Sequence, residues 1–216
     1  MKKLIDELIR DGYLKTPQVI EAFQKIDRAD FLPRDGKSAG QLRIESEINA
    51  PLPTAYGQTI SQPLTVAFML ELLQPTVGER VLDIGSGSGW TACLLAALVG
   101  ETGQVTSLER IPELKKFAEE NSAPYAFPNI TYLVADGWRG YAPNAPYDVI
   151  HVAAAVTEIP EALMQQLQPG GRLCLPVGSV GQDLVLISKK SDGQITEKRY
   201  PGFVFVPLRR DEPEEN

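Results

Sequence analysis

The stretch VLDIGSGSG, residues 81–89, decides which fold this sequence can adopt. A short apolar run ends there in three glycines that alternate with single residues, and an apolar helical segment follows from Trp90. Glycine allows a tight turn and lets a ligand approach the backbone without a Cβ in the way. The stretch therefore predicts a buried strand, a ligand-binding turn and a helix in succession.

The same rhythm continues on both sides of this stretch. Strands are expected at 80–84, 104–108, 130–134, 148–152 and 172–177, and helices at 66–73, 90–99, 112–121 and 160–167. Strands that alternate with helices predict an α/β fold with a doubly wound, mostly parallel sheet. After Gly178 three strands follow one another without helices, at 184–188, 195–200 and 203–207. They predict an antiparallel C-terminal edge.

The N-terminal part has a different pattern. Apolar positions predict helices over residues 4–9 and from Thr16-Pro17 to Ile26, whereas the glycines and prolines of 33–58 predict mostly loop. We therefore divide the chain into three parts. We expect residues 1–63 to form N-terminal helices and a functional loop packed on the main domain, residues 64–210 to form the main ligand-binding domain, and residues 211–216 to form an acidic disordered tail.

Composition limits the class of protein. With 43% hydrophobic residues in 216, the chain can bury one large core. Four of the seven net negative charges come from the last six residues, so the body carries −3, and we expect no nucleic-acid partner. Cys93 and Cys174 lie in apolar runs typical of buried, reduced thiols. No stretch predicts a membrane span or a signal peptide, so a cytoplasmic protein is expected.

Three acidic residues suggest the cofactor. Asp83 precedes the glycines, Glu109 ends the next strand, and Asp136 follows the third strand. A carboxylate beside the loop would repel a pyrophosphate but suits a sulfonium, so S-adenosylmethionine is favoured over NAD. Glu109 could accept from ribose hydroxyls and Asp136 from the adenine amino group, although each alone could be a solvated strand end or a turn residue. Together they converge on the carboxyl edge of the sheet.

A longer string then points to a family. GQTISQP, residues 57–63, resembles the protein-L-isoaspartate O-methyltransferases, and the likeness extends over most of the chain. It includes residues 22–33, 51–53, 81–89, 135–140, 145–149, 159–178 and 205–208. The resemblance implies a fold of the class I methyltransferase (Rossmann-like) type. The sequence departs from the family pattern at residues 43–56 and at Ala153, where the family pattern predicts a threonine.

The resemblance also implies an activity. Such an enzyme methylates the α-carboxylate of L-isoaspartyl residues in damaged proteins, which initiates repair and leaves S-adenosylhomocysteine. By resemblance, the catalytic residue is Ser61, and Thr59, Ile60, Ser61, Val206, Pro207 and Leu208 bind the substrate. The cofactor positions are Asp83, Gly85, Ser86, Gly87, Gly89, Glu109, Asp136 and Gly137. The partners would be isoaspartyl peptides and proteins, and the enzyme would act as a monomer.

The chemistry agrees with a chain that has one histidine. A carboxylate is ionised at neutral pH and attacks without a general base, so Ser61 would orient the substrate rather than act as a nucleophile. One histidine and two separated cysteines offer no metal site, so none is expected. Two alternatives stay open: a methyltransferase of the same fold that acts on a small carboxylate or RNA, and a module that binds the cofactor without catalysis.

Overall fold

The computed structural model describes residues 1–210, apart from the side chain of Ala55; the predicted tail lies outside them. Within these residues, seven strands form the main sheet in the order β5-β4-β3-β6-β7-β8-β9. Their bounds are β3 Arg80–Ile84, β4 Gln104–Glu109, β5 Ile130–Val134, β6 Tyr147–Val152, β7 Leu167–Val177, β8 Gln182–Lys189 and β9 Ile195–Phe203. Strands β3 to β7 pair in parallel, and β8 and β9 are antiparallel. The predicted sheet with its antiparallel edge is confirmed.

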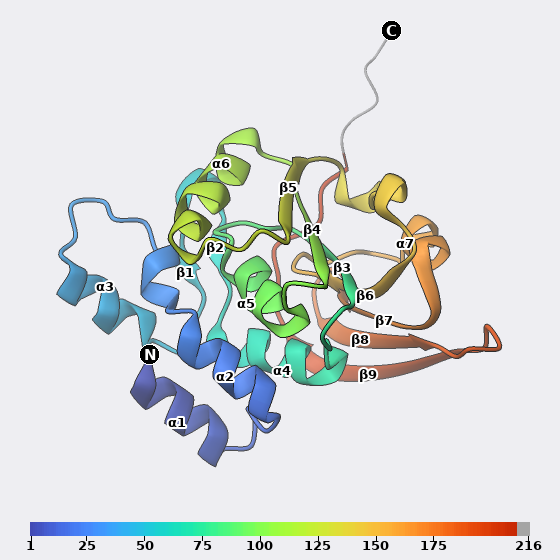
Figure 1. Cartoon of the computed structure of the whole chain (residues 1–216), viewed down its shortest axis with the longest axis horizontal. Helices are drawn as coiled ribbons and strands as arrows, with labels where there is room; N and C mark the ends of the chain where they lie inside the picture. Colours follow the sequence, from blue (N-terminus) through green and yellow to red (C-terminus); the bar gives the residue numbers. More distant parts are fainter. Residues whose placement is uncertain (211–216) are drawn as a thin grey trace, which may run out of the picture.

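Helices cover both faces of this sheet. They are α1 Lys2–Arg10, α2 Pro17–Lys25, α3 Ala39–Ser46, α4 Pro63–Leu73, α5 Trp90–Val99, α6 Pro112–Ser122 and α7 Glu161–Gln166. Figure 1 shows α1 and α2 near α5 and α4, with the β8–β9 hairpin reaching out at the opposite side of the molecule. Within the described part of the chain, no helix is long and apolar enough to cross a membrane.

Alternation along the strands produces two apolar layers. Val81, Val105 and Val149 face α4 and α5, while Leu82 and Ile150 face α7. The first layer continues into α1 and α2, so the N-terminal helices share the core of the main sheet. This packing places the predicted N-terminal part against the rest of the chain, whereas the division at residue 63 stays a prediction.

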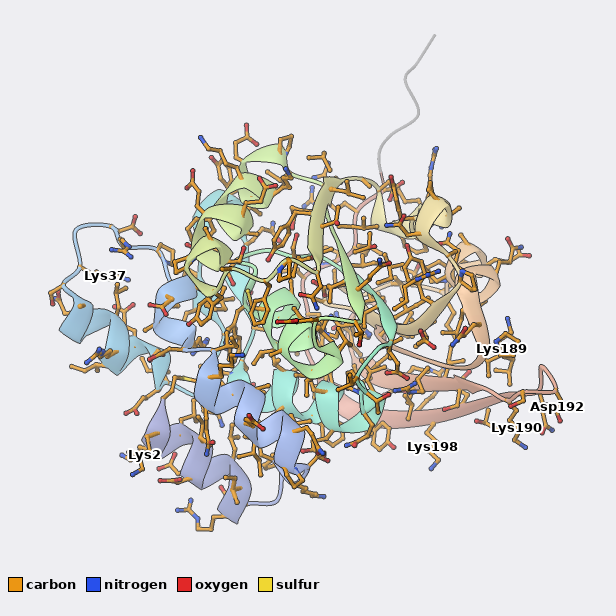
Figure 2. All side chains as sticks on the ribbon, in the orientation of Figure 1. Lys2, Lys37, Lys189, Lys190, Asp192 and Lys198 are labelled. Carbon is orange, nitrogen blue, oxygen red and sulfur yellow. The ribbon has the colours of Figure 1, made fainter. Side chains whose placement is uncertain are left out.

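Charged side chains gather at the periphery. Figure 2 shows Lys2 and Lys37 on the N-terminal helical part and Lys190, Asp192 and Lys198 on the β8–β9 hairpin. Basic and acidic groups alternate on that hairpin.

One helix was not expected from the sequence. The glycines of residues 33–58 predicted mostly loop, but α3 lies within it. The Ser38 hydroxyl accepts from the Gln41 amide and the Gln41 side chain accepts from the Ser38 amide, which is a complete capping box. Gly40 lies in the first turn, where the cap stabilises the helix in spite of the glycine.

The end of the sheet also differs from the prediction. One strand, β9, runs through Pro201 and Gly202, where two strands were expected, and residues 204–206 lie outside any strand. An edge strand tolerates Pro201 because its outward side needs no N–H donor. Beyond Phe203 the Gln182 side chain replaces a strand partner: its amide donates to the Phe205 carbonyl at 3.1 Å and accepts from the Phe205 N–H at 2.6 Å. The chain then leaves the sheet.

Candidate active site

A cavity of about 1090 Å³ opens at the carboxyl ends of β3, β4 and β6. The strand order reverses at β3, because β4 lies on one side of it and β6 on the other. Open α/β sheets bind ligands at such a switch point. Its walls come from the ends of these strands, the segment before α4 and the segment after β9. They include Gly57–Gln62, Ile84–Ser88, Leu108–Ile111, Ala135, Gly137, Ala153, Ala154 and Tyr200–Arg209.

The glycine turn forms part of the cavity wall. Gly85 has a φ of 87° and lies in the wall, where a residue with a Cβ would be strained. Gly89 is the N-cap of α5 with a φ of 88°, and a Cβ there would lie 2.9 Å from the Ala118 carbonyl oxygen. Gly89 thus permits the packing of α5 on α6 and does not line the cavity itself.

Glu109 stands at the end of β4 with its carboxylate in the cavity wall. One oxygen accepts from the Gly87 N–H at 3.0 Å, and the other accepts from Arg110 and Ile111 at 2.9 and 3.1 Å. A carboxylate has about four lone-pair sites, so about one stays open toward the cavity. These contacts connect the glycine turn to β4 and leave room for a hydroxyl donor.

Ser86 provides a direct sign of a polar ligand. Its side chain is buried in the cavity wall, and its hydroxyl has no hydrogen-bond partner within residues 1–210. A buried hydroxyl without a partner is costly, so a ligand that bonds to it gains affinity. Together with the open site on Glu109, it fits a polar cofactor with hydroxyl and amino groups such as S-adenosylmethionine.

Asp83 does not line the cavity. It is fully buried in β3, accepts from the Ser107 hydroxyl at 2.7 Å and lies 2.8 Å from Nδ1 of His151. Asp83 pairs with Ser107 across β4 and with His151 across β6, so the three side chains share one face of the sheet. The carboxylate therefore joins three strands beneath the glycine turn, and its contact with the cofactor stays a prediction.

Asp136 also lies outside the cavity lining, although its neighbour Gly137 is part of it. Its carboxylate accepts from the Trp138 N–H at 2.9 Å and lies 3.8 Å from the Arg139 guanidinium. This is the geometry of a turn residue that caps a short helix. The predicted bond to adenine is untested.

Ser61 also lies in the cavity wall, two residues before α4. The N-cap of α4 is Gln62, so Ser61 does not cap that helix. Thr59 and Ile60 form the short strand β2 Thr59–Ile60, which pairs with β1 Leu52–Pro53. All three predicted residues 59–61 line the same cavity as the glycine turn.

Arg28 fixes the main chain around Ser61. Its guanidinium is fully buried and donates to the carbonyls of Ser46, Ile48, Ala50 and Ser61 at 2.9–3.4 Å. No ion pair within the described residues involves it, and it lies 5.7 Å from the ring of Trp90. Burial lowers the pKa of Arg28 to about 10, so it stays protonated at neutral pH. A buried positive charge therefore lies directly behind Ser61.

The segment after β9 closes the cavity on the third side. We call residues 204–209 the strap. The Val206 carbonyl accepts from Ala155 at 2.8 Å, and the Leu208 N–H donates back to the Ala155 carbonyl at 2.7 Å. Trp138 donates through Nε1 to the Leu208 carbonyl at 2.9 Å. These bonds place the predicted substrate residues Val206, Pro207 and Leu208 in the cavity wall.

Comparison with known proteins identifies the family. The family model described as protein-L-isoaspartate (D-aspartate) O-methyltransferase matches residues 1–213. The chain belongs to this family. The predicted family and the predicted methyltransferase class are confirmed, and with them the S-adenosylmethionine cofactor that the sequence favoured over NAD.

Individual relatives agree with the family match. The protein-L-isoaspartate O-methyltransferase of Methanopyrus kandleri is 43% identical over 98% of this chain and 92% of its own length. That of Pyrococcus abyssi is 42% identical over 96% and 93%. A solved Plasmodium falciparum relative, in complex with S-adenosyl-L-homocysteine, has a TM-score of 0.83 at 26% identity and covers 97% of this chain and 98% of that chain. The fold is of the class I methyltransferase type.

Three residues of the cavity wall, and Arg28 buried behind it, were not singled out from the sequence. Arg28 looked like an ordinary charged residue, since the main-chain carbonyls that it binds lie up to 33 positions away. Phe68 appeared only as part of an apolar helix, and Tyr200 and Phe203 as parts of edge strands. Arg28 belongs to residues 22–33, one of the segments that carried the family resemblance. That resemblance was the one feature of the sequence that could have pointed to Arg28. Within the described residues no group of His, Cys, Asp and Glu side chains could hold a metal ion.

Proposed function

We propose that the protein transfers a methyl group from S-adenosylmethionine to the α-carboxylate of L-isoaspartyl residues in damaged proteins and so initiates their repair. The supporting observation is that Ser61 and the glycine turn line one cavity, although 24 residues separate Ser61 from Gly85. The family match and the names of the relatives support the choice of acceptor.

The cofactor would lie over the glycine turn. Gly85 to Gly87 would contact it through the main chain, the Ser86 hydroxyl would find its missing partner, and Glu109 would accept from a ribose hydroxyl. When bound, S-adenosylmethionine supplies a methyl group on a positively charged sulfur. The chain has to align this group with the acceptor.

The substrate carboxylate would lie at Ser61. With an ordinary pKa near 4 it is ionised at neutral pH and needs no general base. The Ser61 hydroxyl donates to one carboxylate oxygen and leaves the other free to attack. The buried charge of Arg28 behind Ser61 favours an anion at this position. Such alignment can remove roughly 7–11 kcal/mol from the barrier.

The walls exclude water from the reacting groups. The strap closes one side through its bonds to Ala155, and Ile60, which is 2% exposed, closes another. Both segments are held by main-chain bonds, so they present apolar surface at a fixed place. Exclusion of water strengthens the attraction of the Arg28 charge for the carboxylate.

The location, the oligomeric state and the partners are also part of the proposal. We propose that the protein acts in the cytoplasm as a monomer, without a nucleic-acid or membrane partner. The modest negative charge of the body argues against nucleic acid. The monomeric state rests on the resemblance to the family.

The deciding experiment uses labelled S-adenosylmethionine and two matched peptides, one with aspartate and one with isoaspartate. Base-labile label on the isoaspartyl peptide alone is the expected result, because a methyl ester hydrolyses in base. Label on neither peptide, with cofactor binding confirmed, would contradict the proposal. Small carboxylates and RNA, assayed in parallel, test the two alternative acceptors, and cofactor binding without transfer to any acceptor would indicate a binding module.

A further inference from the structure

The cavity extends past Ser61 along α4 to the end of β9. Its volume of about 1090 Å³ exceeds the roughly 300–1,000 Å³ of most small-molecule sites. The glycine turn and Glu109 account for one part of its lining, and Ser61 with Val206, Pro207 and Leu208 for another. The remaining part has room for more than the reacting groups.

Four aromatic side chains line this remaining part, and we call them the aromatic wall. Phe68 comes from α4, Tyr200 and Phe203 from β9, and Phe205 from the strap. Phe68 lies edge-on to Tyr200 at 5.3 Å between ring centroids and stacks on Phe203 at 5.6 Å. Phe203 lies 6.5 Å from Phe205. The rings pack against the core on one side and remain half-buried on the cavity side.

The aromatic wall is close to Ser61. Leu64 and Phe68 are four residues apart in α4, so they lie on one face of the helix, about 6 Å apart along its axis. Side chains of a helix lean toward its N-terminus, which here is the end next to Ser61. An extended peptide advances about 3.4 Å per residue, so its neighbouring residues reach the wall from a carboxylate held at Ser61.

We propose that the aromatic wall is a subsite for an aromatic or large aliphatic side chain that lies within two residues of the isoaspartate. The inference rests on the proposed function and adds a sequence preference to it. The wall carries no charged group, so a charged neighbour would lose its hydration without a partner. An aromatic neighbour would instead cover the half-buried rings and gain edge-to-face or stacked contacts.

The experiment compares isoaspartyl peptides that differ only in the position of one phenylalanine. The residue is moved through the two positions on each side of the isoaspartate, and a peptide with serine at all four serves as the reference. We expect phenylalanine in at least one position to raise kcat/KM about tenfold, mainly through a lower KM.

Variants from two separate elements locate the effect. In Phe68→Ala and in Phe203→Ala the ratio of kcat/KM between the phenylalanine and serine peptides should fall toward one. Phe203 lies on an edge strand, so its replacement tests the wall even if Phe68→Ala folds poorly. Phe127→Ala is the matched control: Phe127 is also half-buried beside another aromatic ring but lies outside the cavity, and the ratio should stay near tenfold.

The outcomes separate this inference from the proposed function. Equal kcat/KM for all isoaspartyl peptides would overturn the subsite and leave the methyl transfer in place. A preference that persists in both wall variants would also overturn it, because other residues would then bind the neighbour. No transfer to any isoaspartyl peptide would overturn the proposed function and the subsite with it.

Discussion

At the scale of single residues, Ser61 and Glu109 line one cavity, and we propose that they bind different ligands. Ser61→Ala should lower turnover of an isoaspartyl peptide about tenfold to a hundredfold, since a hydrogen bond to a charged group contributes about 1.5–3 kcal/mol. Calorimetry should find cofactor affinity within twofold of wild type. Ser191→Ala, on the exposed hairpin turn, is the control. Equal loss of turnover and cofactor affinity would contradict the orienting role.

Glu109→Gln should weaken the binding of the cofactor. The amide has one acceptor oxygen in place of two, so the bonds to Gly87 and to a ribose hydroxyl compete. We expect the Kd of S-adenosylhomocysteine to rise about tenfold, measured by calorimetry, while the peptide KM at saturating cofactor changes little. Glu113→Gln, at an exposed position in α6, should have no effect. Unchanged affinity would remove Glu109 from the cofactor site.

We expect Arg28 to act on the substrate through the main chain around Ser61. In Arg28→Lys the positive charge stays, but an ammonium cannot hold four carbonyls with the planar fork of a guanidinium. The loop around Ser61 should loosen, and the peptide KM should rise about tenfold with cofactor Kd nearly constant. Arg34→Lys is the exposed control. A peptide KM equal to that of wild type would mean that Arg28 serves stability alone.

At the scale of elements, the strap depends on a few bonds that replace a strand. Trp138→Phe removes the bond to the Leu208 carbonyl and keeps an aromatic face near Arg210, whose guanidinium lies 4.1 Å from the ring. We expect faster hydrogen exchange at the Leu208 amide and a peptide KM raised about fivefold. Tyr147→Phe is the control, because it removes a hydrogen bond to the Tyr141 carbonyl, away from the strap. It should leave the Leu208 exchange rate and the peptide KM unchanged. An unaltered Leu208 exchange rate would show that the Ala155 bonds hold the strap alone.

At the scale of the whole molecule, the buried thiols make stability depend on pH. Burial raises the pKa of Cys93 to about 12, and it raises the pKa of Cys174 as well. In the unfolded chain both have ordinary values near 8.5–9. A pKa that is higher in the folded state contributes stability below the unfolded value, and this contribution is lost as pH rises toward the folded value.

Urea unfolding at pH 7.5 and pH 10 measures this loss. For Cys93 alone it should be roughly 1.4–2 kcal/mol at pH 10, since the unfolded chain releases the proton and the folded chain keeps it. The free energy of unfolding of Cys93→Ala should differ less between the two pH values than that of wild type. A thiol reagent at neutral pH should react only after unfolding, and rapid reaction with the folded protein would contradict the burial of both cysteines.

Elements with strong local signals agreed with prediction, and those with conflicting signals did not. The strand and helix around VLDIGSGSG were predicted within a residue, because apolar runs and glycines act over a few positions. Helix α3 was missed because the glycines of residues 33–58 predicted loop, and the Ser38–Gln41 capping box that stabilises the helix was not recognised in the sequence. The last strand was divided in error because pairing with Gln182, and not local propensity, decides where β9 ends.

The sequence by itself determined the α/β class, the antiparallel edge, the type of cofactor and the family, because these follow from periodicity and from short strings with a specific meaning. Only the tertiary structure decided which of the predicted acids faces the cavity: Glu109 does, whereas Asp83 turns toward His151. It also decided that Arg28 supports Ser61 and that Phe68 meets Tyr200 across more than 130 residues. Such contacts depend on how elements distant in the chain pack, and a local pattern carries no information about them.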